Sequence, residues 1–355
     1  MDQIKKIAFP RYANYNIPLK YVVEHGLHAK YVMQPEMTHR TEELGEKYCP
    51  DYVCTPFKTT LGSMIESLEA GANFLFMTHG ACRLSYFGEL QEQILRDLGY
   101  EFEFLNMQEY NTGKKKDWLK ALKKVDPDVN VVKFTAAVRN MLKMMEYIDD
   151  MTYEYYKVCG FDPTHKNCYR VYSKFLRDMN RADTRKDIDD AYYKAKHDLS
   201  MVELKRPDTL LKVGIVGELF TAMDPFSNRN IEQKIADMGV EVHRWMNMSH
   251  MVAHYDDMNL LVQVNEYIEF DMGPTSIENI WTAKKYAQEG FDGLIHIKSA
   301  NCTPETDITV ILQRISNEYK IPLLILTYDT QTSDVGLMTR IEAFYDMIYE
   351  KKRVM

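Results

Sequence analysis

The sequence predicts an α/β protein built from two parallel-sheet lobes with a helical insert between them. Short apolar runs alternate with amphipathic stretches over residues 1–130, and the same alternation returns over residues 207–355. Strands and helices that alternate at this pace are typical of a parallel sheet covered by helices. Residues 131–206 lack this alternation, contain few glycines and are rich in charged residues, Tyr and Met. These observations predict an N-terminal lobe, a helical segment and a C-terminal lobe with those boundaries.

The N-terminal lobe has its clearest helix between Thr60 and Ala70. Apolar residues recur there at the spacing of one helical face, and Gly71 ends the pattern. Apolar runs bounded by turn residues predict the strands. In chain order we expect strand 6–9, helix 18–26, strand 30–33, helix 60–70, strand 74–77, helix 86–98 and strand 101–105.

The helical insert contains long amphipathic stretches, such as residues 138–147 and 188–197, and ends at the linker Arg206-Pro-Asp208. The apolar runs of the C-terminal lobe then resume at Leu211. In chain order we expect strand 211–216, a turn at 217–218, helix 228–238, strand 240–242, helix 276–288, strand 293–297, helix 306–319, strand 322–327 and helix 339–349.

Composition excludes several classes of function. The chain has 355 residues, a net charge of −8 and a pI of about 5.7, so it lacks the basic character of a general nucleic-acid binder. No stretch approaches the roughly 20 apolar residues that cross a bilayer, and the N-terminus has no signal-peptide pattern. We therefore expect a cytoplasmic protein without a membrane partner. Its six cysteines are then expected to be reduced, as ligands or buried apolar residues.

Three cysteines at the ends of predicted elements are candidate metal-cluster ligands. Cys82 follows the strand 74–77, Cys302 follows the strand 293–297, and Cys54 precedes the first long helix. Open α/β sheets place ligands at the carboxyl ends of their strands, and thiolates hold iron–sulfur clusters. Three buried structural cysteines are the alternative, and spacing alone favours it, because cysteines so far apart in sequence are not a specific signal.

Four further residues are candidates for acid–base or charge roles. Glu218 follows the strand 211–216 and is either an active-site carboxylate or a structural residue, as a cap or as a partner to a basic group. Lys58, His79 and Arg83 neighbour the candidate cysteines and could supply charge or protons to a bound substrate. The chain lacks the glycine-rich phosphate-binding signatures, and its histidines lack HExxH and HxH spacing, which counts against a mononuclear metal hydrolase.

Five segments resemble proteins related to the 2-hydroxyacyl-CoA dehydratases and their activase-linked partners. The three cysteine motifs occur in the order and spacing of that superfamily, and the resemblance spans nearly the whole chain. The segments are Cys54–Ala72, Gly80–Gln91, Val216–Glu218 with Phe226-Ser-Asn228 downstream, Cys302–Glu305 and Asp329–Phe344.

The resemblance implies two flavodoxin-like or Rossmann-like α/β lobes and a [4Fe-4S] cluster bound by Cys54, Cys82 and Cys302. A double-cubane cluster, which needs about twice as many thiolates, is less favoured. The resemblance also implies an ATPase activator of the actin/sugar-kinase fold, acting in trans, that delivers a low-potential electron. Three thiolates would leave one iron of the cluster without a protein ligand. A small-molecule substrate, an acyl-CoA in the dehydratases, would bind at that open iron. Cys49 is a candidate fourth ligand. The sequence leaves open whether the chain forms a dimer.

We therefore expect an iron–sulfur protein of the dehydratase type that works anaerobically in the cytoplasm, either as a lyase or as an ATP-coupled reductase component. One alternative is a cluster-binding or electron-transfer module without a substrate. Four protein ligands at the cluster would favour that module, whereas an open iron in a roomy cleft would favour the enzyme. Another alternative is a metal-free α/β protein with buried cysteines.

Overall fold

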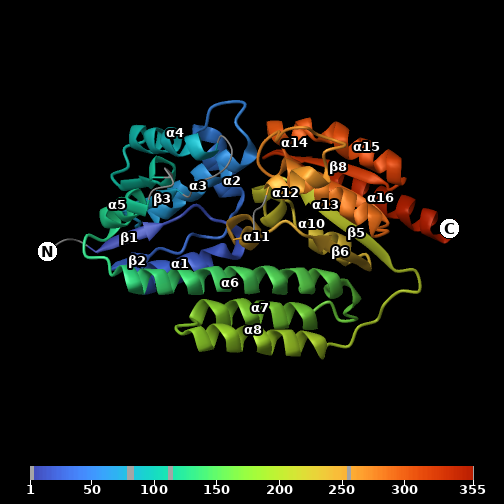
Figure 1. The fold of residues 1–355 in the computed structure, drawn as a ribbon, viewed down its shortest axis with the longest axis horizontal. Helices are drawn as coiled ribbons and strands as arrows, with labels where there is room; N and C mark the ends of the chain where they lie inside the picture. Colours follow the sequence, from blue (N-terminus) through green and yellow to red (C-terminus); the bar gives the residue numbers. More distant parts are fainter. Residues whose placement is uncertain (1–3, 78–83, 111–114, 254–256, 355) are drawn as a thin grey trace. The chain divides into compact units, whose positions relative to one another are not determined.

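The computed structural model describes residues 4–77, 84–110, 115–253 and 257–354 (Figure 1). The chain divides into two compact units, residues 1–145 and 146–355. Each unit contains a four-stranded sheet whose strand pairs are all parallel. The predicted α/β class with two parallel-sheet lobes is thus confirmed. The predicted segment boundaries at residues 130 and 206 stay a prediction.

The first unit contains the predicted strands and helices, and in addition two helices that the sequence did not predict, at His39–Tyr48 and Lys115–Val125. The helix predicted at 60–70 begins earlier than expected, at Thr55, because the extended backbone of Cys54 caps the helix and Pro56 fits its first turn. The elements are β1 (Lys5–Ala8), the 3-10 helix η1 (Ala13–Tyr15), α1 (Asn16–Gly26), β2 (Ala29–Tyr31), α2 (His39–Tyr48), α3 (Thr55–Glu69), β3 (Phe74–Met77), α4 (Leu84–Asp97), β4 (Glu103–Asn106), the 3-10 helix η2 (Met107–Tyr110), α5 (Lys115–Val125) and the start of α6 (Val131–Val158).

The second unit contains the rest of the helical insert and the second sheet. Its elements after α6 are the 3-10 helix η3 (Cys159–Phe161), α7 (Asn167–Arg181), α8 (Arg185–Ser200), β5 (Leu211–Gly217), α9 (Leu219–Met223), α10 (Ile231–Ala236), β6 (Val240–Arg244), α11 (Met248–Ala253), α12 (Asp257–Gln263), α13 (Ser276–Gln288), β7 (Gly293–Ser299), α14 (Thr303–Asp307), α15 (Thr309–Tyr319), β8 (Leu323–Tyr328) and α16 (Asp334–Val354).

Two predicted helices of the second unit need correction. The helix expected at 228–238 is shorter, because Arg229 and Asn230 adopt a left-handed backbone with φ of 56° and 55° and α10 begins only after them. The helix expected at 306–319 consists of α14 and α15. α14 begins at Thr303, directly after Cys302, so Cys302 caps a helix and does not stand four residues before one.

The two sheets share one topology. The strand order is β2-β1-β3-β4 in the first sheet and β6-β5-β7-β8 in the second, so each strand has a counterpart at the same place in the other unit. In each sheet the second strand in chain order pairs with one side of the first strand. The third strand pairs with the other side of the first strand, and the fourth pairs with the third. The point where the order reverses therefore lies between β1 and β3, and again between β5 and β7. Such switch points are where open α/β sheets bind ligands.

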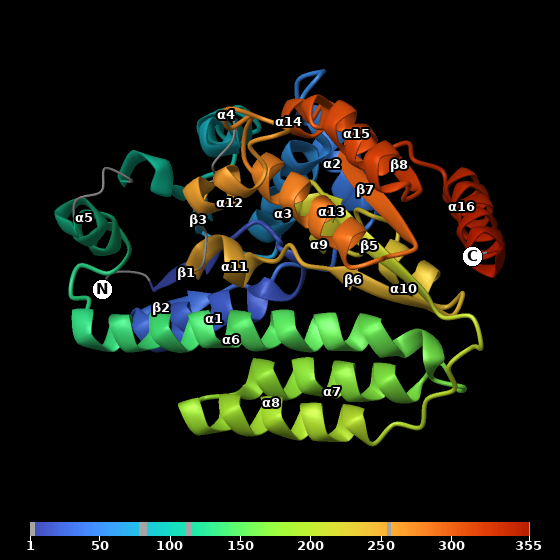
Figure 2. The ribbon, with the colours of Figure 1, turned by 45° about the vertical axis from the view of Figure 1, so that its right-hand side comes forward.

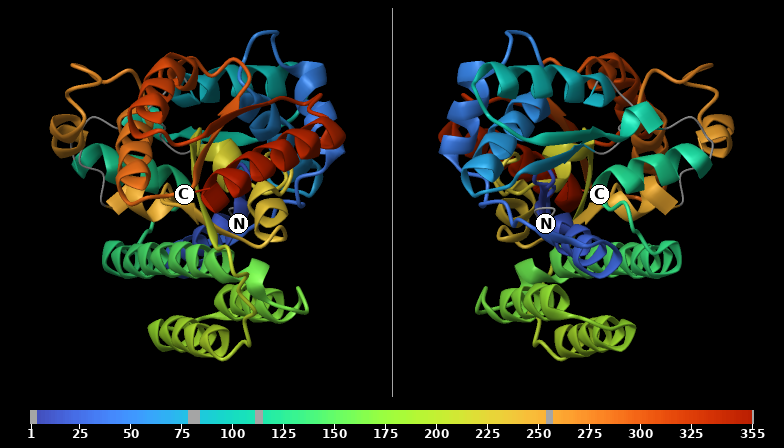
Figure 3. Two further views of the ribbon diagram at one scale, coloured as in Figure 1. Left: turned by 90° about the vertical axis from the view of Figure 1, so that its right-hand side faces the viewer. Right: turned by 90° about the vertical axis from the view of Figure 1, so that its left-hand side faces the viewer.

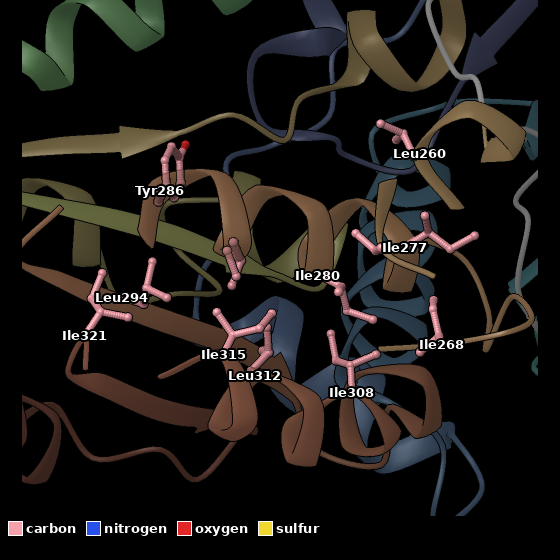
Figure 4. Packing of buried hydrophobic residues seen from close by; sticks show 13 residues of the cluster. Leu260, Ile268, Ile277, Ile280, Tyr286, Leu294, Ile308, Leu312, Ile315 and Ile321 are labelled. Atoms are coloured by element: carbon pink, nitrogen blue, oxygen red, sulfur yellow. The ribbon is translucent and has the colours of Figure 1, made fainter. Parts of the chain in front are cut away.

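Apolar side chains of α13 and α15 form the main core of the second unit. Ile277 and Ile280 of α13 lie near Ile308, Leu312 and Ile315 (Figure 4), and all five are at most 2% exposed. Figure 2 shows α13 lying alongside β5. The opposite face of the sheet is covered by α16, since an added Cβ at Gly293 of β7 would meet Phe344. The sheet is thus covered on both faces, as a parallel sheet requires.

The helices of the insert pack against each other through tyrosines. α7 and α8 lie side by side (Figure 3). Tyr155 of α6 stacks on Tyr172 of α7 with ring centroids 4.7 Å apart, and the Tyr192 hydroxyl of α8 donates to Asp150 of α6 at 2.7 Å. Within the described part of the chain, no helix combines the length and the apolar character needed to cross a membrane.

Candidate functional site

The carboxyl ends of β5 and β7 carry the candidate residues of the second unit. Glu218 follows β5 directly, and Cys302 follows β7 by three residues. Because β5 and β7 are hydrogen-bonded parallel neighbours at the switch point, the two loops leave the sheet at the same edge. Gly217 is needed at the end of β5: its φ is 154°, and an added Cβ would overlap the carbonyl oxygen of Ile297. The sheet therefore places the predicted carboxylate and the predicted thiol at one edge.

Glu218 caps a helix. Its carboxylate accepts hydrogen bonds from the backbone N–H groups of Phe220 and Thr221 and from the Thr221 hydroxyl, at 2.6–2.9 Å. The side chain is buried, and burial raises its pKa; the nearby charge of Glu305 acts in the same direction. The capping role that the sequence left open is therefore present, and the raised pKa is also what an acid–base group needs near neutral pH.

Cys302 is a half-buried thiol outside any disulfide, and it caps α14 with an extended backbone. The residue before it, Asn301, has a left-handed backbone with a φ of 62°. Pro304 lies in the first turn of the helix, and the next residue, Glu305, is fully buried. Strained backbone of this kind often occurs at functional sites.

A buried hydrogen-bond network connects the loops at this edge. The Glu305 carboxylate accepts from the Thr275 hydroxyl and the Asn279 amide, both at 2.9 Å, and lies 2.7 Å from Nε2 of His296 on β7. The Asn279 side chain also accepts from the N–H of Gly217 and donates to its carbonyl oxygen, at 2.9 and 3.1 Å. Asn279 of α13 thus connects the end of β5 to the first turn of α14, beside Cys302.

In the first unit, Cys54 caps α3 in the same way. It is half-buried, not disulfide-bonded and extended, with φ −69° and ψ 156°. Cys54-Thr-Pro and Cys302-Thr-Pro are therefore the same tripeptide in the same local structure, a thiol at a helix start with Pro in the first turn.

Two close contacts join α2 to α3, the helix that Cys54 caps. An added Cβ at Gly45 would overlap the Lys58 carbonyl oxygen, and one at Gly62 would overlap that of Thr41, so only glycine allows this approach. Lys58, a predicted charge donor, forms a 2.7 Å ion pair with Glu46.

The remaining cysteines differ in character. Cys49 ends α2 and is half-buried, and burial raises the pKa of its thiol. Burial also raises the pKa of Cys159, and raises that of Cys168 to about 12. Without a bound metal, Cys159 and Cys168 are therefore poor sources of thiolate.

The predicted residues His79, Cys82 and Arg83 lie outside the described residues. Among the residues that are described, no three His, Cys, Asp or Glu side chains gather in an arrangement suited to a metal ion. By their chemistry, the half-buried thiols of Cys54 and Cys302 fit an iron–sulfur cluster, which takes soft thiolate ligands.

Sequence reasoning missed the network around Glu305. His296 gave a signal, because it is a single polar residue within the apolar run Gly293–Ile297. Thr275 and Asn279 gave none, since both lie at the start of an ordinary amphipathic helix. No model of a known protein family matches this chain, and no curated protein matches it.

Proposed function

We propose that this chain is an iron–sulfur protein of the 2-hydroxyacyl-CoA dehydratase type, with Cys54, Cys82 and Cys302 as cluster ligands. The observation that carries the proposal is the repeated Cys-Thr-Pro helix start. Each unit presents one half-buried, non-disulfide thiol in this local structure. A structural cysteine gains nothing from partial exposure, whereas a ligand must reach the surface of its unit.

Bound at these thiols, a [4Fe-4S] cluster would supply low-potential electron transfer and an iron that acts as a Lewis acid. The chain's own residues would hold and surround it. Glu218, at the same sheet edge as Cys302, has a raised pKa and could hold a proton for a substrate oxygen. An ATPase activator of the actin/sugar-kinase fold would provide the electron, and the substrate would be a small molecule of the acyl-CoA class.

The test is the iron and acid-labile sulfide content of protein purified without oxygen, together with its EPR spectrum. We expect about four of each per chain, lost in Cys54→Ser and in Cys302→Ser. The matched control is Cys168→Ala, which removes a buried thiol and should leave the content unchanged. Protein that stays free of iron after anaerobic reconstitution would refute the proposal.

The Cys49→Ser variant distinguishes a cluster that binds substrate from a cluster that only transfers electrons. If its iron content and EPR spectrum match the wild type, three thiolates suffice and one iron is open to substrate. If the cluster is lost, Cys49 is a fourth ligand, and an electron-transfer module without a substrate is the better description.

A further inference from the structure

The helices α2 and α3 pack in an antiparallel register that can be followed residue by residue. At Gly62 of α3, an added Cβ would overlap the carbonyl oxygen of Thr41 on α2. At Gly45 of α2, an added Cβ would overlap that of Lys58 on α3. From the first contact to the second, the pairing advances by one helical turn along α2 and goes back by one turn along α3. Both contacts exclude any side chain larger than hydrogen, so the two backbones lie very close together.

One further turn in the same direction brings Cys49 level with Cys54. Cys49 lies one turn after Gly45, whose carbonyl oxygen accepts a hydrogen bond from its N–H. Cys54 lies one turn before Lys58, at the start of α3. The short loop between the two cysteines reverses the chain, with Tyr52 in a left-handed backbone at a φ of 65°. Both thiols are half-buried and pack against the same hydrophobic core, so the register, the short loop and this core all bring them together.

The charge of Lys58 also reaches Cys49. Burial raises the pKa of the Cys49 thiol, and the Lys58 ammonium opposes that shift. The thiol donates to the carbonyl oxygen of Glu46 at 3.7 Å, and the Glu46 carboxylate pairs with Lys58 at 2.7 Å. Because Lys58 belongs to α3, these contacts place Cys49 on the side of α2 that faces α3. A nearby cation favours the thiolate, which is the form that attacks a disulfide.

We propose that Cys49 and Cys54 are a redox-active pair that closes into an intramolecular disulfide when the protein meets a small-molecule disulfide. The Cys54 thiolate attacks one sulfur of glutathione disulfide, forms a mixed disulfide and releases one glutathione thiolate. The Cys49 thiolate then attacks the Cys54 sulfur and releases the second. Two protein thiols are thus oxidised to one disulfide. Glutathione disulfide is reduced to two glutathione molecules, which take up the two thiol protons.

The disulfide would block one position of the proposed cluster, since a sulfur bound in it cannot bind iron. That consequence alone rests on the iron–sulfur proposal. Cys302 begins the same Cys-Thr-Pro tripeptide, but the five residues before it contain no cysteine. The closing thiol is therefore a feature of the first unit only.

The test follows the thiols by peptide mass spectrometry. Full-length protein, freed of metal by a chelator without oxygen, is equilibrated with glutathione and glutathione disulfide, alkylated and digested. Trypsin releases residues 48–58 as one peptide that contains both thiols. We expect this peptide to lose two hydrogens, to resist alkylation and to carry no glutathione. The control Cys302→Ser should behave in the same way, whereas Cys49→Ser should keep glutathione on Cys54.

A comparison in urea shows whether the fold brings the thiols together. At one glutathione ratio, the disulfide-to-dithiol ratio should be at least about tenfold higher in folded protein than in urea, because the helices raise the effective concentration of the thiols. The proposal is overturned if folding gives no such excess. It is also overturned if, in excess glutathione disulfide, the wild-type peptide stays alkylated, keeps glutathione or links to another peptide. If the protein never binds iron, the iron–sulfur proposal fails and the disulfide result stands.

Discussion

Truncating Asn279 should destabilise the second unit strongly. In the Asn279→Ala variant, three hydrogen bonds of a side chain that is 1% exposed disappear. Two of them satisfy the backbone of Gly217 at the end of β5, and the third reaches Glu305. Because this edge is buried, water cannot replace the lost partners fully.

The expected loss follows from these contacts. A buried hydrogen bond contributes about 1 kcal/mol, and leaving a buried group unpaired costs about 1–3 kcal/mol. Glu305 keeps Thr275 and His296, so the main penalty arises at Gly217. We therefore expect Asn279→Ala to lower the free energy of unfolding by about 3–5 kcal/mol, a large share of the about 5–15 kcal/mol typical of a domain.

Urea unfolding followed by tryptophan fluorescence measures this loss. Two of the three tryptophans, Trp245 and Trp281, belong to the second unit, so a Trp118→Phe background restricts the signal to that unit. The control is Asn317→Ala on the exposed side of α15, which should change the free energy of unfolding by less than about 0.5 kcal/mol. A loss below about 1 kcal/mol for Asn279→Ala, with an unchanged m-value, would show that the network does not hold this edge together.

Three further predictions concern other parts of the chain. Gly62→Ala should destabilise the first unit by about 3 kcal/mol or more in urea unfolding, whereas Gly336→Ala, where an added Cβ meets nothing within 4 Å, should not destabilise the second. The hydrogen bond with His243 lowers the pKa of Glu241, so its contribution to stability is present above the ordinary glutamate pKa and is lost as the pH falls below it. The melting temperature of Glu241→Gln should therefore fall less steeply with decreasing pH than that of the wild type. Cys168 should react with iodoacetamide at pH 8 at least 100-fold more slowly than the two helix-capping cysteines, as peptide mass spectrometry can show; equal rates would contradict its burial.

The fold was predictable because its signals are local. The apolar runs of β3 and β7 and the helical spacing of α13 are visible within a few residues of sequence, and the structure places all three where they were expected. α2 was missed because most of its residues are polar. Its position depends on a tertiary contact, the close approach to α3 at Gly45 and Gly62, which no local pattern reports.

The candidate site was harder to predict because its chemistry depends on convergence of distant residues. Glu278 and Glu305 are both acidic residues in the first turn of a helix, where a carboxylate favourably offsets the helix dipole. From sequence alone the two are equivalent. In the structure Glu305 is surrounded by three donors, whereas neither oxygen of Glu278 accepts a hydrogen bond from the described residues. That difference makes Glu305 a connection between loops and Glu278 the ion-pair partner of His250, at 3.3 Å, and it arises from how α11, α13 and β7 pack.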